Sequence, residues 1–146
     1  MPFDLTGQTA SVTGGASGIG EAISRRLDVL AADIDMFAVD AIRLNSIANG
    51  VSVEASGRDL LEIPARNCEV ILVGDLFYEK DLAAKVFRWL EEAEARGIVT
   101  LIGDPGRSYL PRERLEKLAE YKVAVTRDLE DAEVKLTSVW RLSRYC

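Results

Sequence analysis

Short runs of consecutive apolar residues constrain the fold of this chain more than any other feature. The segments E-V-I-L-V-G-D at 69–75 and G-I-V-T-L-I-G-D at 97–104 are apolar without alternation. Strands of this kind are covered on both faces, as in the parallel sheets of α/β proteins. Seven strands are expected, at Gln8–Val12, Val29–Asp33, Val51–Ala55, Val70–Gly74, Ile98–Gly103, Lys122–Arg127 and Lys135–Leu142. Because helix-period segments separate most of them, the sequence predicts an α/β fold.

Four helices are expected between these strands. The first runs from Ser17 to Leu27, and the fourth follows Pro111, a residue suited to a first helical turn. The second, Met36 to Asn49, ends at Gly50, and the third, Asp81 to Arg96, ends at Gly97; glycine favours the left-handed conformation that closes a helix. The apolar stripes expected to face the core are Phe37, Ala41, Leu44 and Ala48 on the second helix, and Leu82, Val86, Trp89, Leu90 and Ala93 on the third.

The length of 146 residues suits one domain spanning 1–146. We expect a Rossmann-like, doubly wound and mostly parallel sheet with helices on both faces and the first strand near its centre. The segment E-D-A-E at 130–133 is too short for a helical crossover, so the last two strands should form an antiparallel β-hairpin at the sheet edge. A cofactor cleft is expected at the carboxyl ends of the strands, where the strand order reverses.

Composition narrows the classes of partner. With 24 acidic and 18 basic residues the net charge is −6, which repels phosphate backbones and anionic lipid and excludes nucleic acid and membranes as expected partners. No histidine is present, so histidine-based catalysis is excluded, and the two cysteines do not suggest a metal site. Without a signal-peptide pattern or a long apolar run, a soluble cytoplasmic protein is expected. The oligomeric state stays open.

Residues 13–20 read T-G-G-A-S-G-I-G, a glycine-rich turn between an expected strand and an expected helix. Such a turn lets the backbone approach an anion, and the helix N-terminus behind it offers free N–H groups. Asp33 ends the next strand, where an acid can accept hydrogen bonds from a ribose. This arrangement predicts a small-molecule nucleotide cofactor as ligand.

The stretch L-T-G-Q-T-A-S-V-T-G-G-A-S-G-I-G-E-A-I resembles the N-terminus of short-chain dehydrogenases/reductases, over roughly residues 4–27. The resemblance implies a pyrophosphate site for NAD lined by Thr13, Gly14, Ser17, Gly18, Ile19 and Gly20. Asp33 and Ile34 would follow at the ribose, and the charge of Asp33 would repel the 2′-phosphate of NADP. No tyrosine has a lysine four residues later, so the Tyr-x-x-x-Lys pair of these oxidoreductases is absent.

From Val29 onward, the segments A-A-D-I-D, V-G-D-L-F-Y-E-K-D-L-A, L-I-G-D-P-G-R and T-S-V-W resemble class I S-adenosylmethionine methyltransferases. Among these they are similar to the enzymes acting on lysine of the electron-transfer flavoprotein β-subunit and to predicted nicotinamide N-methyltransferases. The resemblance implies that Asp33 binds the cofactor ribose and that Asp59 and Leu60 lie beside the adenine. It further implies that Asp75 and Tyr78, the D-x-x-Y signature, position an acceptor amine for methylation.

The two resemblances meet at Leu27–Asp28, where a strand follows a helix with no connecting residues. The sequence therefore predicts a chimera, natural or engineered, of a dehydrogenase-like segment 1–27 and a methyltransferase-like segment 28–146. Either residues have been deleted at this junction or a disordered loop is missing from the sequence. The second alternative is favoured, and it predicts that the Cα atoms of Leu27 and Asp28 lie far beyond the roughly 3.8 Å of bonded neighbours.

Three functions remain open. The first is a module that binds NAD without efficient turnover, favoured because a pyrophosphate gains from the loop amides and a sulfonium cofactor does not. The second is an N-methyltransferase that uses S-adenosylmethionine, with S-adenosylhomocysteine as its product, to modify a protein lysine or a small amine. The third is a recombined fold with no cofactor activity. No metal ligand is expected in any of them.

Three further features are expected to be structural. The segment Asp104–Arg107 makes a turn, in which Arg107 either has no partner or meets a carboxylate or phosphate. Trp89 and Trp140 are expected in the core. Cys68 has little basic company and is expected to be an unreactive thiol.

Overall fold

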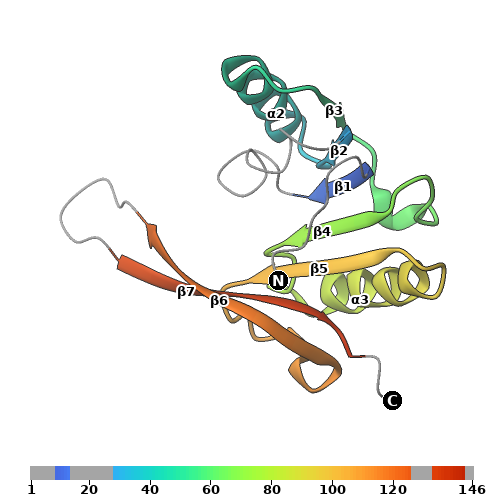
Figure 1. The fold of residues 1–146 in the computed structure, drawn as a ribbon, viewed down its shortest axis with the longest axis vertical. Helices are drawn as coiled ribbons and strands as arrows, with labels where there is room; N and C mark the ends of the chain where they lie inside the picture. The colour runs from blue at the N-terminus through green and yellow to red at the C-terminus, as the bar shows by residue number, and fades with distance from the viewer. Residues whose placement is uncertain (1–8, 14–27, 126–132, 144–146) are drawn as a thin grey trace.

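The computed structural model of the chain describes residues 9–13, 28–125 and 133–143, which form one seven-stranded sheet with two helices (Figure 1). The strand order is β3-β2-β1-β4-β5-β7-β6. The first five strands are parallel, and β7 is antiparallel to both β5 and β6. The strands are β1 (Thr9–Thr13), β2 (Asp28–Ala32), β3 (Val53–Ser56), β4 (Val70–Gly74), β5 (Val99–Asp104), β6 (Leu115–Val125) and β7 (Glu133–Leu142). This confirms the predicted α/β sheet with its central first strand and its antiparallel hairpin at one edge.

Alternate residues of β4 separate the two faces of the sheet. Ile71 and Val73 are buried in a large apolar cluster with helix α3 (Lys80–Glu94), whereas Val70 belongs to a second cluster with helix α2 (Met36–Asn49). Successive residues of a strand point to opposite faces, so α2 and α3 cover opposite sides. The chain order agrees, because right-handed crossovers that run in opposite directions along a sheet place their helices on opposite faces.

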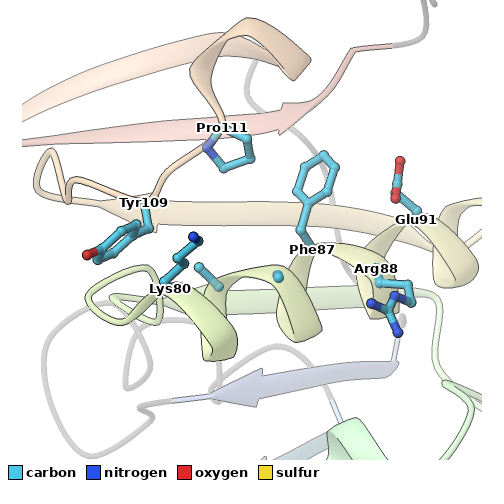
Figure 2. Close-up of a pocket in the computed structure, with 8 residues that line it drawn as sticks. Lys80, Phe87, Arg88, Glu91, Tyr109 and Pro111 are labelled. Atoms are coloured by element: carbon cyan, nitrogen blue, oxygen red, sulfur yellow. The ribbon is translucent and has the colours of Figure 1, made fainter.

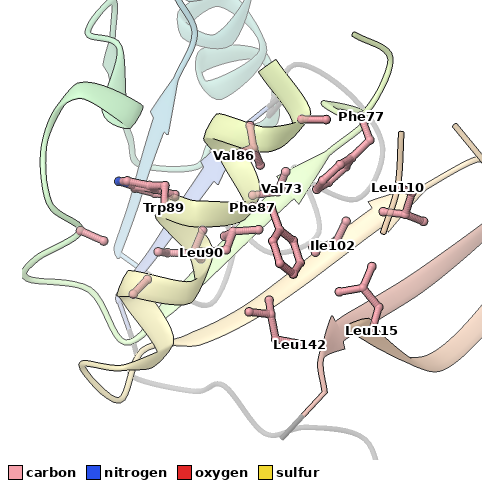
Figure 3. Close-up of a cluster of buried hydrophobic side chains, with 14 of the residues drawn as sticks. Val73, Phe77, Val86, Phe87, Trp89, Leu90, Ile102, Leu110, Leu115 and Leu142 are labelled. Carbon is pink, nitrogen blue, oxygen red and sulfur yellow. The ribbon is translucent and has the colours of Figure 1, made fainter. Parts of the chain in front are cut away.

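Helix α3 (Lys80–Glu94) buries the apolar stripe that the sequence predicts. Val86, Trp89 and Leu90 pack against β4 and β5 and against the start of the β6–β7 hairpin (Figure 3). The indole Nε1 of Trp89 also donates a hydrogen bond to the carbonyl of Ile63 at 2.8 Å, so this side chain satisfies its polar atom while remaining in the core. Gly97 follows the helix at a φ of 83°, in the left-handed region that glycine adopts without strain.

Helix α2 (Met36–Asn49) has the predicted bounds and ends at the predicted glycine, Gly50. The Asp35 carboxylate accepts a hydrogen bond from the Phe37 amide at 2.9 Å, and Gly50 closes the helix at a φ of 61°. The predicted core stripe is wrong, however. Phe37 is 86% exposed and Leu44 is 68% exposed. The helix instead buries Val39 and Ile42.

This error has a physical origin. Helix α2 carries apolar residues on two faces, and helical periodicity alone cannot say which face meets the sheet. The β-branched side chains of Val39 and Ile42 face the sheet, and Ile42 shares its cluster with Val29 and Val70. The outward face of α2, defined here as Phe37, Ala41, Leu44 and Ala48, is therefore not part of the core.

The predicted fourth helix is also wrong. After Pro111 the chain makes only a 3-10 turn, η2 (Arg112–Arg114), and β6 begins at Leu115, seven residues before the predicted start at Lys122. The segment L-E-K-L-A-E has good intrinsic helix propensity, but here it pairs with β7 from Leu115↔Leu142 onward. Burial of both leucines in the large cluster and a long antiparallel ladder override that propensity.

Several predictions lie outside the described residues. They include the loop from Gly14 to Gly20, the expected helix Ser17–Leu27 and the spacing between Leu27 and Asp28, where Asp28 is the first described residue of β2. Neither of the helices in the described ranges is long and apolar enough to cross a membrane.

Candidate functional site

The carboxyl ends of the parallel strands meet at one edge of the sheet, and an acidic residue follows or ends four of them. Thr13 at the end of β1 pairs with Ala32 at the end of β2, and Ala32 pairs with Ser56 at the end of β3. On the other side of β1, Gly74 at the end of β4 is level with Gly103 of β5. The acids at this edge are Asp33 after β2, Asp59 after β3, Asp75 after β4 and Asp104 at the end of β5.

The strand order reverses next to β1, because the chain builds β2 and β3 on one side of it and β4 and β5 on the other. Ligands of open α/β sheets bind in the crevice at such a switch point. Thr13 ends β1 at this point. The other predicted loop residues, Gly14, Ser17, Gly18, Ile19 and Gly20, lie outside the described residues, so their part in a site stays a prediction.

Asp33 is held in place by the backbone around it. Its amide donates to the carbonyl of Ser56 at 3.1 Å, and its Oδ1 accepts a hydrogen bond from the amide of Asp35 at 2.9 Å. The carboxylate is therefore fixed at the strand end, immediately before α2. The next residue, Ile34, is 75% exposed and offers an apolar surface beside the acid. An oriented carboxylate next to an exposed aliphatic side chain suits a ribose joined to a flat base.

Asp59 and Leu60 are turned towards α3. Asp59 caps the 3-10 turn η1 (Leu60–Glu62) through a hydrogen bond from the Leu61 amide, and its other oxygen lies 3.2 Å from Nζ of Lys85. Lys85 also contacts Glu62. The hydrogen bond to Glu62 and, to a smaller extent, that to Asp59 raise the pKa of Lys85. Leu60 packs against the large apolar cluster. The predicted role of both residues beside an adenine stays a prediction.

Asp75 forms an ion pair at this edge. It follows β4 in a left-handed conformation, with a φ of 53°, and its amide donates to the carbonyl of Gly103 at 3.0 Å. Nε and Nη2 of Arg107 donate to the two oxygens of Asp75 at 2.6 and 2.7 Å, a bidentate pair. The hydrogen bonds to Asp75 raise the pKa of Arg107. The open question of Arg107 is thereby answered, since it meets a carboxylate.

Tyr78 projects from the same segment. The buried side chain of Phe77 anchors the segment in the core, while Tyr78 is 58% exposed. The predicted D-x-x-Y pair therefore lies on one short segment at the carboxyl edge, with its phenol accessible. Whether both residues meet a substrate stays a prediction.

The turn after β5 holds Arg107 against Asp75. Asp104 is buried, at 1% exposure, and its Oδ1 accepts hydrogen bonds from the amides of Gly106 and Arg107, both at 2.7 Å. Farther along, the Tyr109 amide donates to the carbonyl of Phe77 at 3.4 Å. The sequence analysis missed the role of Asp104, although an aspartate that opens D-P-G-R is the usual residue for capping its own turn.

A separate hollow of about 320 Å³ lies beside α3, between that helix and the Tyr109–Pro111 segment (Figure 2). It contains none of the acids of the carboxyl edge. Its lining residues are Lys80, Ala83, Ala84, Phe87, Arg88, Glu91, Tyr109 and Pro111.

Possible metal ligands are not clustered in the described residues. Among the described residues, no group of three or more cysteine or acidic side chains could hold an ion. Cys68 is partly buried, and burial raises its pKa, in agreement with the expected unreactive thiol. The carboxyl edge therefore offers single, oriented carboxylates that accept hydrogen bonds from hydroxyl and amine groups.

Comparison with known proteins places this edge in context. The chain is 32% identical over 132 residues to the electron transfer flavoprotein beta subunit lysine methyltransferase of Rattus norvegicus, and 30% identical over 132 residues to that of Homo sapiens. Each match covers 86% of this chain, which spans about half the length of these relatives, 52% and 50%. No protein-family model matches.

These matches bear on the predicted chimera. A match of 86% of the chain is longer than the whole stretch from Asp28 to Cys146, so it extends into the segment that resembles a dehydrogenase. The comparisons thus give no support to a second ancestry that ends at Leu27.

Solved structures of methyltransferases share the fold. Magnesium protoporphyrin IX methyltransferase from Synechocystis, solved with bound S-adenosylmethionine, superposes with a TM-score of 0.64 at 11% identity, covering 96% of this chain and 72% of that one. The N-methyltransferase NodS from Bradyrhizobium japonicum superposes with a TM-score of 0.61 at 13% identity, covering 94% and 87%. The chain therefore has the Rossmann-like α/β fold of class I methyltransferases. Its sequence is similar to about half of the length of electron transfer flavoprotein beta subunit lysine methyltransferases.

Proposed function

We propose that this chain binds S-adenosylmethionine at the carboxyl edge of its sheet and takes part in methyl transfer to an amine. The observation that carries the proposal is the placement of Asp33 and Asp75 on either side of β1, at the switch point of a methyltransferase fold. The residues present fit the cofactor. Asp33 offers an oriented carboxylate for ribose hydroxyls, and the exposed side chain of Ile34 offers a surface for the base.

When bound, S-adenosylmethionine supplies a methyl group on a positively charged sulfur. The chain would bind and orient the two reactants. Asp33 accepts hydrogen bonds from the ribose. Asp75 accepts a hydrogen bond from an N–H of the substrate amine, so that the nitrogen lone pair points towards the methyl group. Tyr78, exposed on the same segment, would flank the acceptor.

The acceptor class follows from the residue at the end of β4. A carboxylate orients an N–H donor, so an amine is a suitable acceptor. The similar mammalian proteins are named as lysine methyltransferases of the electron transfer flavoprotein beta subunit, which supports the side-chain amine of a protein lysine as the substrate.

Calorimetric titration with S-adenosylhomocysteine tests cofactor binding. We expect saturable binding that Asp33→Ala weakens at least about tenfold, since a hydrogen bond to a charged group contributes about 1.5–3 kcal/mol. Asp40→Ala is the matched control, because Asp40 is an exposed aspartate of α2 paired only with Arg43 among the described residues. Absence of binding by the wild-type chain would refute the proposal.

NAD is the competing ligand, since the loop T-G-G-A-S-G-I-G has the pattern of a pyrophosphate site. The comparisons support S-adenosylmethionine instead. A parallel titration separates the two, because binding of NAD without binding of S-adenosylhomocysteine would restore the first expectation. If neither ligand binds, the fold has no cofactor activity with these two compounds, which favours the third function.

Turnover is tested by transfer of a radiolabelled methyl group from S-adenosylmethionine to purified electron transfer flavoprotein β-subunit. We expect incorporation that Asp75→Ala reduces about a hundredfold, the size of effect that loss of positioning can produce. Glu92→Ala, an exposed acid on α3, should leave the rate unchanged. If Asp75→Ala transfers methyl groups as fast as the wild-type chain, the role of Asp75 is wrong.

A further inference from the structure

We propose that Arg107 is a positioning residue that neutralises Asp75, so that the acceptor site admits an uncharged amine and does not stabilise an ammonium ion. The inference rests on the proposed amine methylation and adds to it a residue outside the D-x-x-Y signature. It starts from the bidentate pair between Arg107 and Asp75 described above.

The pair orients Asp75 without using up its acceptor capacity. A carboxylate has about four lone-pair sites on its two oxygens, and a bidentate guanidinium occupies two of them. Side chains of both residues are about half exposed, 44% for Arg107 and 49% for Asp75, so the remaining sites can reach a ligand. An incoming N–H can therefore still donate to Asp75.

Hydrogen bonds hold the backbone around Arg107. Its amide and that of Gly106 donate to the buried carboxylate of Asp104, and the turn is tied to the Asp75 segment a second time by the hydrogen bond from Tyr109 to Phe77. The backbone that carries Arg107 is thus held by hydrogen bonds before and after it. This support indicates a built arrangement at the edge and not a chance contact of two surface side chains.

The charge of the pair matters for the chemistry. A lysine amine with a pKa near 10 is almost entirely protonated at neutral pH, and its ammonium form has no lone pair. In the transfer, the amine lone pair forms the new N–C bond while the electron pair of the breaking C–S bond returns to sulfur, and one proton leaves the nitrogen to water. A lone Asp75 carboxylate would stabilise the unreactive ammonium form, whereas the Asp75–Arg107 pair has no net charge.

Other charged groups lie in this region. Among the described residues, the buried carboxylate of Asp104 acts on Arg107 through space; its Oδ1 accepts hydrogen bonds from two turn amides, and its Oδ2 has no hydrogen-bond partner. Glu79 accepts a hydrogen bond from the Asp81 amide at the start of α3. Arg112 is a second cation near this turn, with its Nη2 3.5 Å from the position that a Cβ on Gly106 would take, but Arg107 is the one that pairs with Asp75.

A binding measurement tests the inference without any turnover. The full chain, saturated with S-adenosylhomocysteine, is titrated at pH 7 and constant ionic strength with n-butylammonium chloride, a probe for the lysine side chain, and followed by NMR at the amides of Asp75 to Tyr78. We expect Arg107→Gln to bind the probe at least about threefold more tightly than the wild-type chain, and the Asp75→Asn/Arg107→Gln double variant to lose that gain. Arg88→Gln, an exposed arginine on α3, is the control and should behave as wild type. Equal probe binding by Arg107→Gln and the wild-type chain would overturn the inference.

The pH dependence of methyl transfer gives a second readout. Removing the cation should raise the pKa of the bound amine by about one unit, so Arg107→Gln should move the rate profile to higher pH and lower the rate at pH 7 about tenfold. Arg107→Lys restores the charge without the bidentate geometry, so it should return the profile to its wild-type position at a reduced maximal rate. A profile that does not move in Arg107→Gln contradicts the inference.

Failure of the proposed function and failure of the inference about Arg107 give different results. If the wild-type chain transfers no methyl group, the proposed function fails, while the butylammonium titration still decides the role of Arg107. If the wild-type chain is active and the arginine variants keep its pH profile and probe affinity, only the inference about Arg107 fails.

Discussion

The two helices differ in how much they bury. Among the described residues, α3 buries Ala83, Val86, Phe87, Trp89, Leu90 and Ala93 within a cluster of fifteen apolar residues, whereas α2 buries Val39 and Ile42, and the cluster of Ile42 has four described members, Val29, Ala31, Ile42 and Val70. Both helices have similar lengths and both are closed by a left-handed glycine. The described residues therefore show that helix formation and core formation are separate matters, and that α3 contributes far more to stability than α2.

The largest expected difference is between matched leucines. Leu90 on α3 is fully buried, so Leu90→Ala should reduce the free energy of unfolding by about 3 kcal/mol, through lost burial and a residual cavity. Leu44→Ala on the outward face of α2 should change it by less than about 0.5 kcal/mol. Urea denaturation of both variants measures the two values. Equal losses would show that a partner segment covers α2 in solution and would end the comparison.

Deletion of a buried polar contact on each face should give the next largest effect. Asp104→Ala removes a charged acceptor from two amides and should cost about 2–3 kcal/mol. Ser46→Ala on α2 removes one neutral hydrogen bond, to the carbonyl of Val51, and should cost about 1 kcal/mol. Asp104→Asn keeps one acceptor oxygen and should recover part of the loss. If Ser46→Ala costs as much as Asp104→Ala, polar contacts do not follow the difference between the two cores.

The glycines that close the helices should respond alike. Gly50 and Gly97 have φ values of 61° and 83°, and a Cβ added at either would meet no atom within 4 Å. Alanine should therefore cost about 1 kcal/mol at both sites, because only the left-handed backbone resists it. Asparagine at position 50 should cost less, since it tolerates that conformation. Thermal unfolding of the alanine variants measures this, and a much larger loss at one site would point to a contact missing from the structure.

The smallest effect concerns Lys85, which joins α3 to Asp59 and Glu62 at the surface. Its pKa is raised in the folded state, so its contribution to stability is fully present below its unfolded pKa and is lost as the pH rises through the folded value. We expect Lys85→Met to lower the melting temperature slightly at pH 7, by less than either glycine replacement, and to differ still less from wild type at pH 11. A difference that grows with pH would contradict the sign of this shift.

The sequence allowed prediction of those parts of the fold where one pattern has one interpretation. The run V-I-L-V-G was predicted as a covered strand, and α3, predicted at Asp81–Arg96 and observed at Lys80–Glu94, was placed by its single apolar stripe. The stripe of α2 was not predictable, because two of its faces are apolar and only packing against β2 and β4 selects one. The start of β6 was missed for a related reason, since Leu142, the partner of its first residue Leu115, lies 27 positions later in the sequence.

The site divides in the same way. Asp33 was predicted from its place at an expected strand end and Asp75 from the D-x-x-Y signature, and in the structure each directly follows a strand. The contact between Asp75 and Arg107 joins residues 32 positions apart and depends on the register of β4 with β5. Sequence reasoning identified the turn that carries Arg107 and left its partner open, because register is not written in the local pattern.

The outer position of β6 among the described strands has a consequence for the behaviour of the protein at high concentration. A long strand at a sheet margin offers unpaired amides and carbonyls to neighbouring molecules and can seed fibrous assemblies. Here Glu116, Lys117, Glu120 and Lys122 are exposed along that strand, so a second molecule that docked there would have to dehydrate four charges. We expect these residues to act as gatekeepers that disfavour pairing of a second molecule with this edge.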